Sequence, residues 1–538
     1  MLHFKFHSIV VANLRRLMLL LAATALVLST TAAQADLGDQ LFKLLADDGT
    51  AGNAFGRSVT ISGVTAIVGA SDDSDNGLWS GSAYLFDTTT RQQIAKLLPE
   101  DGAALDFFGY SVAISGTTAI VGARMDDDNG IDSGSAYLFD ITTGQQIAKL
   151  LPNDGEAGDY FGTSVAISGT TAIVGAPEDD DNDGNSGSAY LFDTTTGQQI
   201  AKLLPSDGAA GDEFGYSVAI HRASAVVGAR GDHDNGNRSG SAYVFHTTSG
   251  EQNVKLLPYD GAANDEFGTS VSIRGEIAII GAPEDRDNGV GSGSAYMFNT
   301  ITGEQIAKLL PSDGSPLDRF GISVAIGSVT AIVGASGDED NGDVSGSAYL
   351  FDTITGQQIA KLLPDDGAAE DYFGRSGAIS GTTAIVGAFW NDDNGIDSGS
   401  AYVFAAAFCP WDLDDDGAVG PFDLAFLLGF WGPNPDHPAD LDSDGEVGPF
   451  DLALLLGNWG SCPAVVCLDP KEDSTYLSCF AIADCDVDGD VIEYGLSECH
   501  CLGGISEERC CDEILEGFES SCESSGGILL NFICNCIP

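Results

Sequence analysis

The sequence predicts an all-β fold in which seven four-stranded sheets close into a ring, followed by two smaller C-terminal regions. Three observations predict it: a 53-residue repeat that recurs seven times, four short strand-like runs in each repeat, and one unmatched strand-like run ahead of the first repeat. Repeats of this length are typical of solenoids, propellers and arrays. We therefore expect the repeats to fill residues 36–408, with separate regions at 409–462 and 463–538.

The first 35 residues have the pattern of a secretory signal peptide. Lys5, Arg15 and Arg16 supply the positive start, residues 17–28 the apolar run, and Ala33-Gln34-Ala35 the cleavage site. The apolar run is short for a bilayer span, which takes about 20 residues. We expect an exported protein, secreted or held at the cell surface, with no transmembrane segment in the mature chain.

Each repeat carries the same landmarks at the same spacing. A Phe-Gly pair recurs from Phe55 to Phe373, a Gly-Ala pair from Gly69 to Gly387, and a GSAY block from Gly81 to Gly399. The runs SVAIS, TAIVGA, SAYLF and QIAKLL of the third repeat are rich in β-forming residues and bounded by Gly, Thr and Asp. No run reaches helical length, so each repeat is predicted to be an antiparallel meander, and the seven together a seven-bladed β-propeller.

The two ends of the repeat array indicate how the ring closes. The seventh repeat stops after GSAYVF and lacks its KLL strand, whereas residues 40–45 form an unmatched QLFKLL ahead of the first repeat. If this leading strand completes the last blade, two exposed sheet edges disappear. An open solenoid, the alternative, needs no such exchange, so the ring is favoured.

The Phe-Gly and Gly-Ala-Pro spacing resembles the FG-GAP repeats of integrin α-chain propellers and their bacterial relatives. The full pattern is present only where Pro177 and Pro283 follow Gly-Ala, but the regular spacing covers all seven repeats. Integrin-type repeats often carry a calcium loop between the two motifs. Here that place holds a tight turn such as residues 168–171, so the resemblance does not imply that calcium site.

Acidic residues dominate the charge of the chain. The 80 Asp and Glu against 22 Lys and Arg give a net charge of −58, which argues against a nucleic-acid partner. The loops from strand 2 to 3 and from strand 4 to 1, which share one end of each blade, hold 44 of the 80 acids. Oxygen ligands at alternate loop positions suit calcium, and in the third blade Asp179, Asp181 and Asp183 are candidate calcium ligands. The alternative is a solvated acidic rim whose Asp, Asn and Gly residues only form turns.

Aromatic residues mark the first and last blades. Trp79 lies in the strand 2 to 3 loop of the first blade, and Phe389 and Trp390 lie in the same loop of the last. Ring closure makes these blades neighbours. The three residues are therefore a candidate ligand patch that stacks on sugar rings or anchors a protein. The alternative is that they pack the closure itself.

Residues 409–462 contain a second duplication, 28 residues apart, with the spacing of EF-hand calcium loops. Aspartates occupy positions 1, 3, 5 and 12, Gly occupies position 6, and position 7 offers a backbone carbonyl. The predicted calcium ligands are Asp412, Asp414, Asp416, Ala418 and Asp423 in the first loop and Asp440, Asp442, Asp444, Glu446 and Asp451 in the second. Apolar helix-like stretches follow both loops.

This pair of loops resembles a dockerin, which implies calcium-coupled folding of a small α-helical EF-hand module and docking onto a cohesin-like partner. Pro421-Phe422 and Pro449-Phe450 replace the polar residues that usually read that partner, so cohesin binding does not follow directly. All 12 Cys lie at or after Cys409, and an even number in an exported chain predicts a disulfide-rich tail.

These features favour a non-catalytic binding or adhesion scaffold that depends on calcium and presents propeller loops to a protein or glycan ligand. No His recurs among the blades and no nucleophile, zinc or phosphate-loop motif is present. The alternative is a dockerin-bearing component of a polysaccharide-degrading system, either an enzyme or an accessory subunit, because the carboxylate separation that glycoside hydrolysis needs is invisible in sequence. Near-identical blades favour the scaffold.

Overall fold

A computed structural model describes the ring in full and selected segments after it. The described residues are 37–406, 418–419, 421–429, 431–433, 446–447, 452, 455, 460–461, 477–487, 490–501 and 528–537. The predicted signal peptide at 1–35 lies outside these residues.

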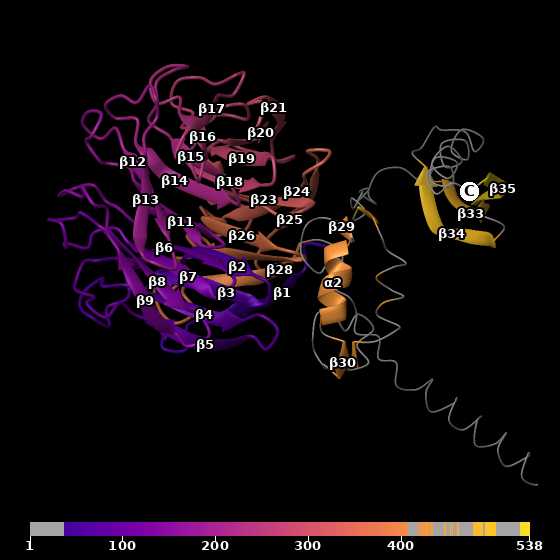
Figure 1. Ribbon diagram of the computed structural model, residues 1–538, viewed down its shortest axis with the longest axis horizontal. Helices are drawn as coiled ribbons and strands as arrows, with labels where there is room; N and C mark the ends of the chain where they lie inside the picture. Colours follow the sequence, from indigo (N-terminus) through magenta and orange to yellow (C-terminus); the bar gives the residue numbers. More distant parts are fainter. Residues whose placement is uncertain are drawn as a thin grey trace, which may run out of the picture. The chain divides into compact units, whose positions relative to one another are not determined.

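The described ring consists of seven four-stranded antiparallel sheets, as the repeats predict. Figure 1 shows the sheets following one another in chain order, from indigo through magenta to orange. In each sheet the first strand begins at or just after the Phe-Gly pair, the second is TAIVGA-like, the third is SAYLF-like and the fourth contains Lys-Leu. Neighbouring strands in these sheets are consecutive in sequence in all but one sheet, so every blade is a simple meander.

The strand bounds repeat with the period of the sequence. The first strands are β2 (Phe55–Ser62), β6 (Phe108–Ser115), β10 (Ser164–Ser168), β14 (Phe214–His221), β18 (Ser270–Arg274), β22 (Phe320–Ile326) and β26 (Ser376–Ser380). The second strands are β3 (Thr65–Ala70), β7 (Thr118–Ala123), β11 (Thr171–Ala176), β15 (Ser224–Ala229), β19 (Ile277–Ala282), β23 (Thr330–Ala335) and β27 (Thr383–Ala388). The third strands are β4 (Ser82–Asp87), β8 (Ser135–Asp140), β12 (Ser188–Asp193), β16 (Ser241–His246), β20 (Ser294–Asn299), β24 (Ser347–Asp352) and β28 (Ser400–Ala405). The fourth strands are β5 (Gln92–Leu97), β9 (Gln145–Leu150), β13 (Gln198–Leu203), β17 (Gln252–Leu256), β21 (Gln305–Leu309), β25 (Gln358–Leu362) and, for the last blade, β1 (Gln40–Leu44).

The ring closes as the sequence predicts, with the leading strand in the last blade. β1 pairs antiparallel with β28, and Lys43 lies opposite Tyr402. The two strands lie side by side in Figure 1 although one is indigo and the other orange. The first strands contact one another around the whole ring, β26 against β2 included, so they line its axis.

The Phe-Gly and Gly-Ala motifs exist because two backbones meet between neighbouring blades. A Cβ on Gly69 of the first blade would lie 2.0 Å from the carbonyl oxygen of Gly109 in the second, closer than any side-chain atom can come. The same carbonyl accepts a 2.8 Å hydrogen bond from the Ser58 hydroxyl. The contact recurs at every blade boundary and ends with Ser376 donating to Gly56 across the closure. Glycine at both positions therefore sets the spacing of the blades.

The hydrophobic core lies between blades rather than within one sheet. Phe108 packs edge-on against Tyr137 and Phe139, with ring centroids 5.5 and 5.8 Å apart. Its cluster also takes in Ile67 and Leu85 from the preceding blade. Burial of this apolar surface is the main stabilising term, and each blade needs its neighbour to complete it.

After the ring, the described residues of the predicted calcium module are few. They form β29 (Ala418–Val419), α2 (Pro421–Gly429), β30 (Gly432–Pro433), β31 (Glu446–Val447) and β32 (Gly460–Ser461). β29 pairs with β32 and β30 with β31. Among the predicted ligands, Ala418 and Glu446 lie in strands, and Asp423 lies buried in the first turn of α2. The other seven, Asp412, Asp414, Asp416, Asp440, Asp442, Asp444 and Asp451, lie outside the described residues, so this calcium module stays a prediction.

Residues 466–538 form a separate unit. Its described part is a three-stranded antiparallel sheet of β33 (Leu477–Val487), β34 (Asp490–Cys501) and β35 (Ile528–Ile537), in the order β34-β33-β35. The register places Cys479 opposite Cys499 on one side and Cys536 on the other. The predicted disulfides stay untested. None of the helices among the described residues is long and apolar enough to cross a membrane.

Candidate functional site

The acidic loops of the ring are organised around lysines. In the first blade the Lys96 ammonium lies 2.8 Å from Asp48, 2.9 Å from Asp73 and 2.6 Å from Asp75. Asp48 comes from the strand 4 to 1 loop, and Asp73 and Asp75 come from the strand 2 to 3 loop. The Tyr84 hydroxyl lies within hydrogen-bond distance of both carboxylates, 2.8 Å from Asp73 and 3.0 Å from Asp48. We call this arrangement of one lysine and its aspartates a lysine cage.

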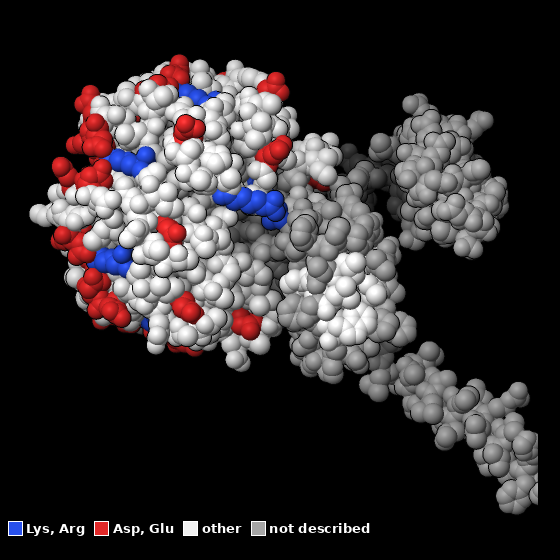
Figure 2. All heavy atoms as spheres, in the orientation of Figure 1, with Lys and Arg blue, Asp and Glu red and all other residues white. Residues whose placement is uncertain are grey.

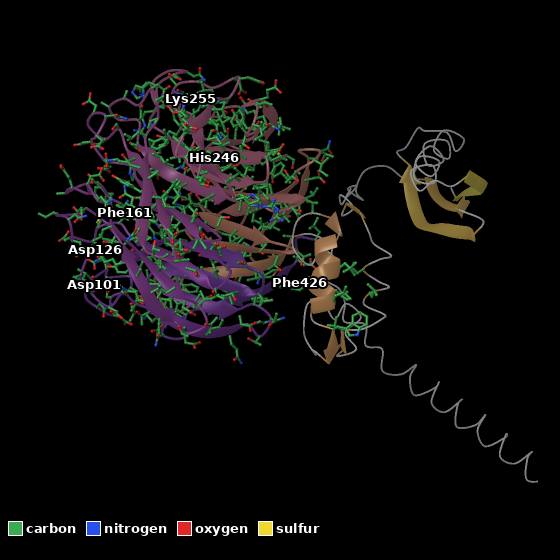
Figure 3. All side chains as sticks on the ribbon, in the orientation of Figure 1. Asp101, Asp126, Phe161, His246, Lys255 and Phe426 are labelled. Carbon is green, nitrogen blue, oxygen red and sulfur yellow. The ribbon has the colours of Figure 1, made fainter. Side chains whose placement is uncertain are left out.

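Seven cages follow one another around the ring. Six hold three aspartates each, around Lys96, Lys149, Lys202, Lys255, Lys308 and Lys361, and the seventh is built on Lys43 of β1. In Figure 3 Asp101 and Asp126, which share Lys149, lie close together at the loop edge of the ring. Figure 2 shows red carboxylates gathered along this edge with blue side chains among them.

The seventh cage differs in one residue. Asn391 stands where the other blades have the buried aspartate, and its Oδ1 lies 3.3 Å from the Lys43 ammonium. Asp366 and Asp393 are the two carboxylates that remain. The cage therefore persists with one negative charge fewer.

The cages bear on the candidate calcium loop of the third blade. Asp179 and Asp181 both contact Lys202, whereas the Asp183 side chain accepts the backbone N–H of Gly184. Burial by itself would lower the pKa of Lys202, but the carboxylates around it raise this pKa to about 12. Within the described residues no group of three or more His, Cys, Asp or Glu side chains is arranged to hold a metal. The cation that crowded carboxylates require is thus supplied by the chain, while calcium in this loop stays a prediction.

A second set of side chains lines the axis of the ring at the same loop end. The residue after each Phe-Gly pair lies on the axis, one per blade, and these seven line a cavity of 140 Å³: Arg57, Tyr110, Thr163, Tyr216, Thr269, Ile322 and Arg375. Two further cavities, of 260 and 130 Å³, adjoin it and share Tyr216 with it. We call the lining of these three cavities the axial site.

The blades differ from one another at the axial site. The residue before each Phe-Gly pair is Ala, Phe, Tyr, Glu, Glu, Arg and Tyr in turn, and the residue after Gly-Ala is Ser, Arg, Pro, Arg, Pro, Ser and Phe. Six of the ten arginines between residues 37 and 406 lie here or at its edge: Arg57, Arg124, Arg230, Arg238, Arg319 and Arg375. Positive charge therefore collects inside a strongly acidic face.

Backbone strain accompanies this variation. The residue before each Phe-Gly pair has a positive φ, from 53° at Ala54 to 57° at Arg319. A serine precedes each GSAY block, and the residue before that serine also has a positive φ, as at Trp79 and Val344. Only one blade places Gly at this position. The two positions are joined across each blade boundary by a backbone hydrogen bond, such as Phe107 N–H to Trp79 O at 3.1 Å. Bulky residues pay roughly 1 kcal/mol or more to adopt this conformation, so side chains other than Gly are retained against a cost.

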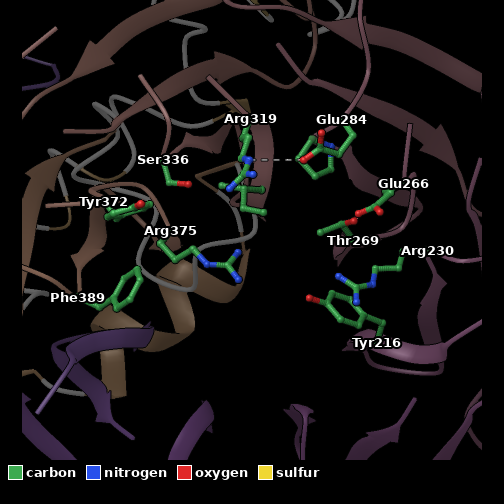
Figure 4. Close-up of a pocket in the computed structure, with 12 residues that line it drawn as sticks. Tyr216, Arg230, Glu266, Thr269, Glu284, Arg319, Ser336, Tyr372, Arg375 and Phe389 are labelled. Carbon is green, nitrogen blue, oxygen red and sulfur yellow. Dashed lines mark hydrogen bonds and ion pairs between the residues drawn. The ribbon is translucent and has the colours of Figure 1, made fainter. Parts of the chain in front are cut away.

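The axial arginines fall into two groups. Arg230 and Arg238 both contact Glu213, at 2.5 and 3.2 Å, and Arg238 also contacts Glu266 at 3.1 Å. Arg319 pairs with Glu284 at 3.5 Å, the contact drawn dashed in Figure 4. In the described part of the chain, the remaining three, Arg57, Arg124 and Arg375, have no carboxylate within 4.0 Å. Figure 4 shows Arg375 and Arg230 pointing into the cavity from opposite sides.

The predicted aromatic patch divides into two clusters. Trp79 is 43% exposed and packs on Phe107 at 5.9 Å, whereas Trp390 is 40% exposed and packs on Tyr372 at 4.7 Å. Phe389 is buried and lines the largest axial cavity. Among the described residues no ring contact joins the two tryptophans directly, and their role as a ligand patch stays a prediction.

Sequence reasoning missed both the lysine cages and the axial site. The cages had a signal, because one lysine stands in every fourth strand, always next to Leu-Leu. The axial site also had one, because the third residue of FGRS, FGYS and FGTS changes between repeats that are otherwise nearly identical.

With this geometry in view, the comparisons with known proteins decide the family. The FG-GAP repeat family matches seven segments: 39–86, 92–139, 145–192, 198–245, 251–298, 304–351 and 357–404. The chain belongs to the FG-GAP repeat family. Each matched segment begins within or just before a fourth strand and ends in a third strand, so one FG-GAP repeat spans two neighbouring blades. No curated protein matches the chain.

Proposed function

We propose that this FG-GAP protein is an exported, non-catalytic binding or adhesion scaffold whose axial site holds the ligand. The observation that carries the proposal is the break in symmetry at the axis. Seven blades keep their cores, cages and blade contacts nearly unchanged, yet they place different residues at the positions that line the cavities. A surface that varied only by drift would not need side chains in strained backbone conformations.

The axial site also has the composition of a recognition surface. Arginine and tyrosine, with Trp390 and Phe389 nearby, are the side chains that dominate binding hot spots. The cages make the surrounding loops rigid, because each ties two loops of one face to a fourth strand. A rigid frame around a variable centre lowers the entropy cost of binding.

Calcium enters this proposal through the tandem loops at 409–462, which supply a folded module for attachment to a protein partner such as a cohesin-like domain. Neither calcium nor a partner is needed for the axial site itself. The secreted location rests on the predicted signal peptide and the position of the cysteines.

A glycan and peptide array probed with the full chain tests the proposal, followed by a hydrolysis assay on each glycan that binds. We expect binding without turnover. The axial variant Tyr216→Ala should lose its hits, and Gln145→Ala, on a fourth strand away from the axis, should keep them. Hits unaffected by Tyr216→Ala would place the ligand elsewhere, and turnover would favour an enzyme of polysaccharide breakdown.

A further inference from the structure

Two of the axial arginines converge on one hydroxyl group, and a third lines the same cavity. Arg57 Nη2 donates to the Tyr110 hydroxyl at 3.1 Å, and Arg124 Nη1 donates to the same oxygen at 3.2 Å. Arg375 lines the same cavity as Arg57 and Tyr110. These residues come from the first, second and seventh blades, so the group forms only when the ring is closed.

The charge of this group is balanced only at a distance, because Glu178 and Glu213 line the 130 Å³ cavity beside Arg124 but form no ion pair with it. Arg57, Arg124 and Arg375 have no carboxylate of the described residues within 4.0 Å, whereas the other axial arginines pair with Glu213, Glu266 or Glu284. The Nε of Arg124 is buried and has no hydrogen-bond partner. Half-buried guanidinium groups without a paired anion are costly, so this group should favour the binding of an anion.

The titration behaviour of the group agrees with this geometry. Burial acts to raise the pKa of Tyr110, yet this pKa is lowered because Arg57, Arg124 and Arg375 all favour the phenolate. Burial, and after it the charge of Arg57, lowers the pKa of Arg375. Both shifts have the direction expected of an excess of positive charge.

Aromatic faces alternate with these guanidinium groups. Arg57 lies over Phe389 at 5.3 Å and over Tyr110 at 4.8 Å. Arg124 lies over Tyr110 at 4.2 Å and over Tyr160 at 5.5 Å. A ligand that matches this row needs an anionic group for the arginines and a flat, partly apolar body for the rings.

We propose that Arg57, Arg124 and Arg375, with Tyr110, bind the carboxylate of a uronic-acid sugar whose ring packs on the neighbouring aromatic side chains. The planar guanidinium fork matches a carboxylate in a bidentate geometry. Cavities of 140 and 130 Å³ that share Tyr110 give the group room beside the arginines. This inference rests on the proposed function, because it names the ligand class of the same axial site.

Titration calorimetry of the full chain with trigalacturonate, and with its fully methyl-esterified form, tests the proposal at low ionic strength. We expect the acid to bind about 10-fold or more tighter than the ester, since the ester cannot pair with guanidinium. Arg57→Gln should weaken acid binding by about 10- to 100-fold. The matched control Arg91→Gln, an exposed arginine over Phe42, should leave it unchanged. Equal affinity for acid and ester would overturn the inference and leave the axial site as a neutral-ligand site.

A second measurement uses the unmodified chain and so does not depend on whether a variant folds. Tyrosine labelled with carbon-13 at Cζ allows the Tyr110 hydroxyl to be titrated by NMR. Saturating trigalacturonate should raise the pKa of Tyr110, because the bound carboxylate offsets the arginines. No binding of trigalacturonate, or an unchanged Tyr110 pKa at saturation, would overturn the inference. If array ligands, acidic peptides included, still depended on Tyr216, the proposed function would survive that result.

Discussion

The lysine cages, which form the rim of the loop face, and the axial site at its centre differ in how their charges are balanced. At the rim, seven lysine cages repeat one arrangement of a cation among aspartates, and only Asn391 departs from it. At the axis, seven equivalent positions carry four different residue types, and Arg57, Arg124 and Arg375 have no carboxylate of the described residues within 4.0 Å. Balanced, repeated charge indicates a structural role, whereas unbalanced, varied charge indicates a place kept for another molecule. The comparison predicts opposite responses to mutation.

The largest effect is expected from removing a caged lysine. Lys149→Met leaves Asp101, Asp126 and Asp128 together without their cation, and Asp126 is only 5% exposed. We expect a loss of about 2 to 4 kcal/mol in the free energy of unfolding at pH 7, because breaking such a pair leaves buried charge uncompensated. Denaturation in guanidinium chloride measures this loss in the free energy of unfolding. The blade-seven substitution Asn391→Asp, which recreates the common cage, is the control and should change stability far less. A loss below about 0.5 kcal/mol, the size expected of an exposed ion pair, would show that the cages contribute little to stability.

A smaller, pH-dependent effect is expected from a row of buried aspartates beneath the rim. Burial raises the pKa of Asp106, Asp159, Asp265 and Asp318 to about 6. The folded state then holds more protons than the unfolded state between about pH 4 and pH 6, so these groups lower stability as pH rises through that window. The first blade has Asn53 at this position.

Asp106→Asn copies the first blade and removes one of these titrations. We expect it to raise the free energy of unfolding by about 1 kcal/mol at pH 7.5, after allowance for screening, and to change it little at pH 4.5. Thermal melts at the two pH values measure the difference. Destabilisation at pH 7.5 would mean that the Asp106 carboxylate is needed as an acceptor for the Ala103 N–H, which it accepts at 2.6 Å.

At the axis, removing a cation should change the free energy of unfolding in the opposite direction from removing a caged lysine at the rim. Arg375→Gln removes one of three mutually repelling guanidinium groups, so we expect stability to stay level or rise by up to about 1 kcal/mol at low salt. The gain should shrink in 0.5 M salt, a concentration at which charges are strongly screened. Denaturant titrations at low salt and in 0.5 M salt measure the change in the free energy of unfolding under the two conditions. A loss comparable to that of Lys149→Met would show that the axial arginines are structural.

The smallest effect is expected from calcium on the ring. Because lysines already occupy the cages, calcium should leave the melting of the ring unchanged while it stabilises the predicted module at 409–462. Calorimetry of the full chain with calcium and with chelator separates the two transitions. Lys202→Met opens a cage around Asp179 and Asp181, and calcium should then raise the melting temperature of the ring. A calcium response of the unmodified ring would instead locate an ion among its loops.

The comparison also shows what sequence can and cannot predict. Period, strand runs and the unmatched leading strand were enough for the seven blades and for the closure through β1, because each depends on local patterns and on edge pairing. The role of Lys96 depends on contacts between residues 48 positions apart, and the cluster of Arg57, Tyr110 and Arg375 depends on ring closure. These contacts appear only when the blades are placed around an axis. The contact of Asp179 and Asp181 with Lys202 likewise joins a loop to a strand of the folded blade, and calcium at these residues stays a prediction.

The most direct test of the central claim is hydrogen–deuterium exchange of the full chain with and without an array ligand. If the axis holds the ligand, protection should concentrate in residues 54–57, 107–110 and 372–375, the segments that carry the varied positions. The cage segments, such as 73–77, should exchange at unchanged rates. Protection confined to the cage segments, with the axial segments unchanged, would contradict the account.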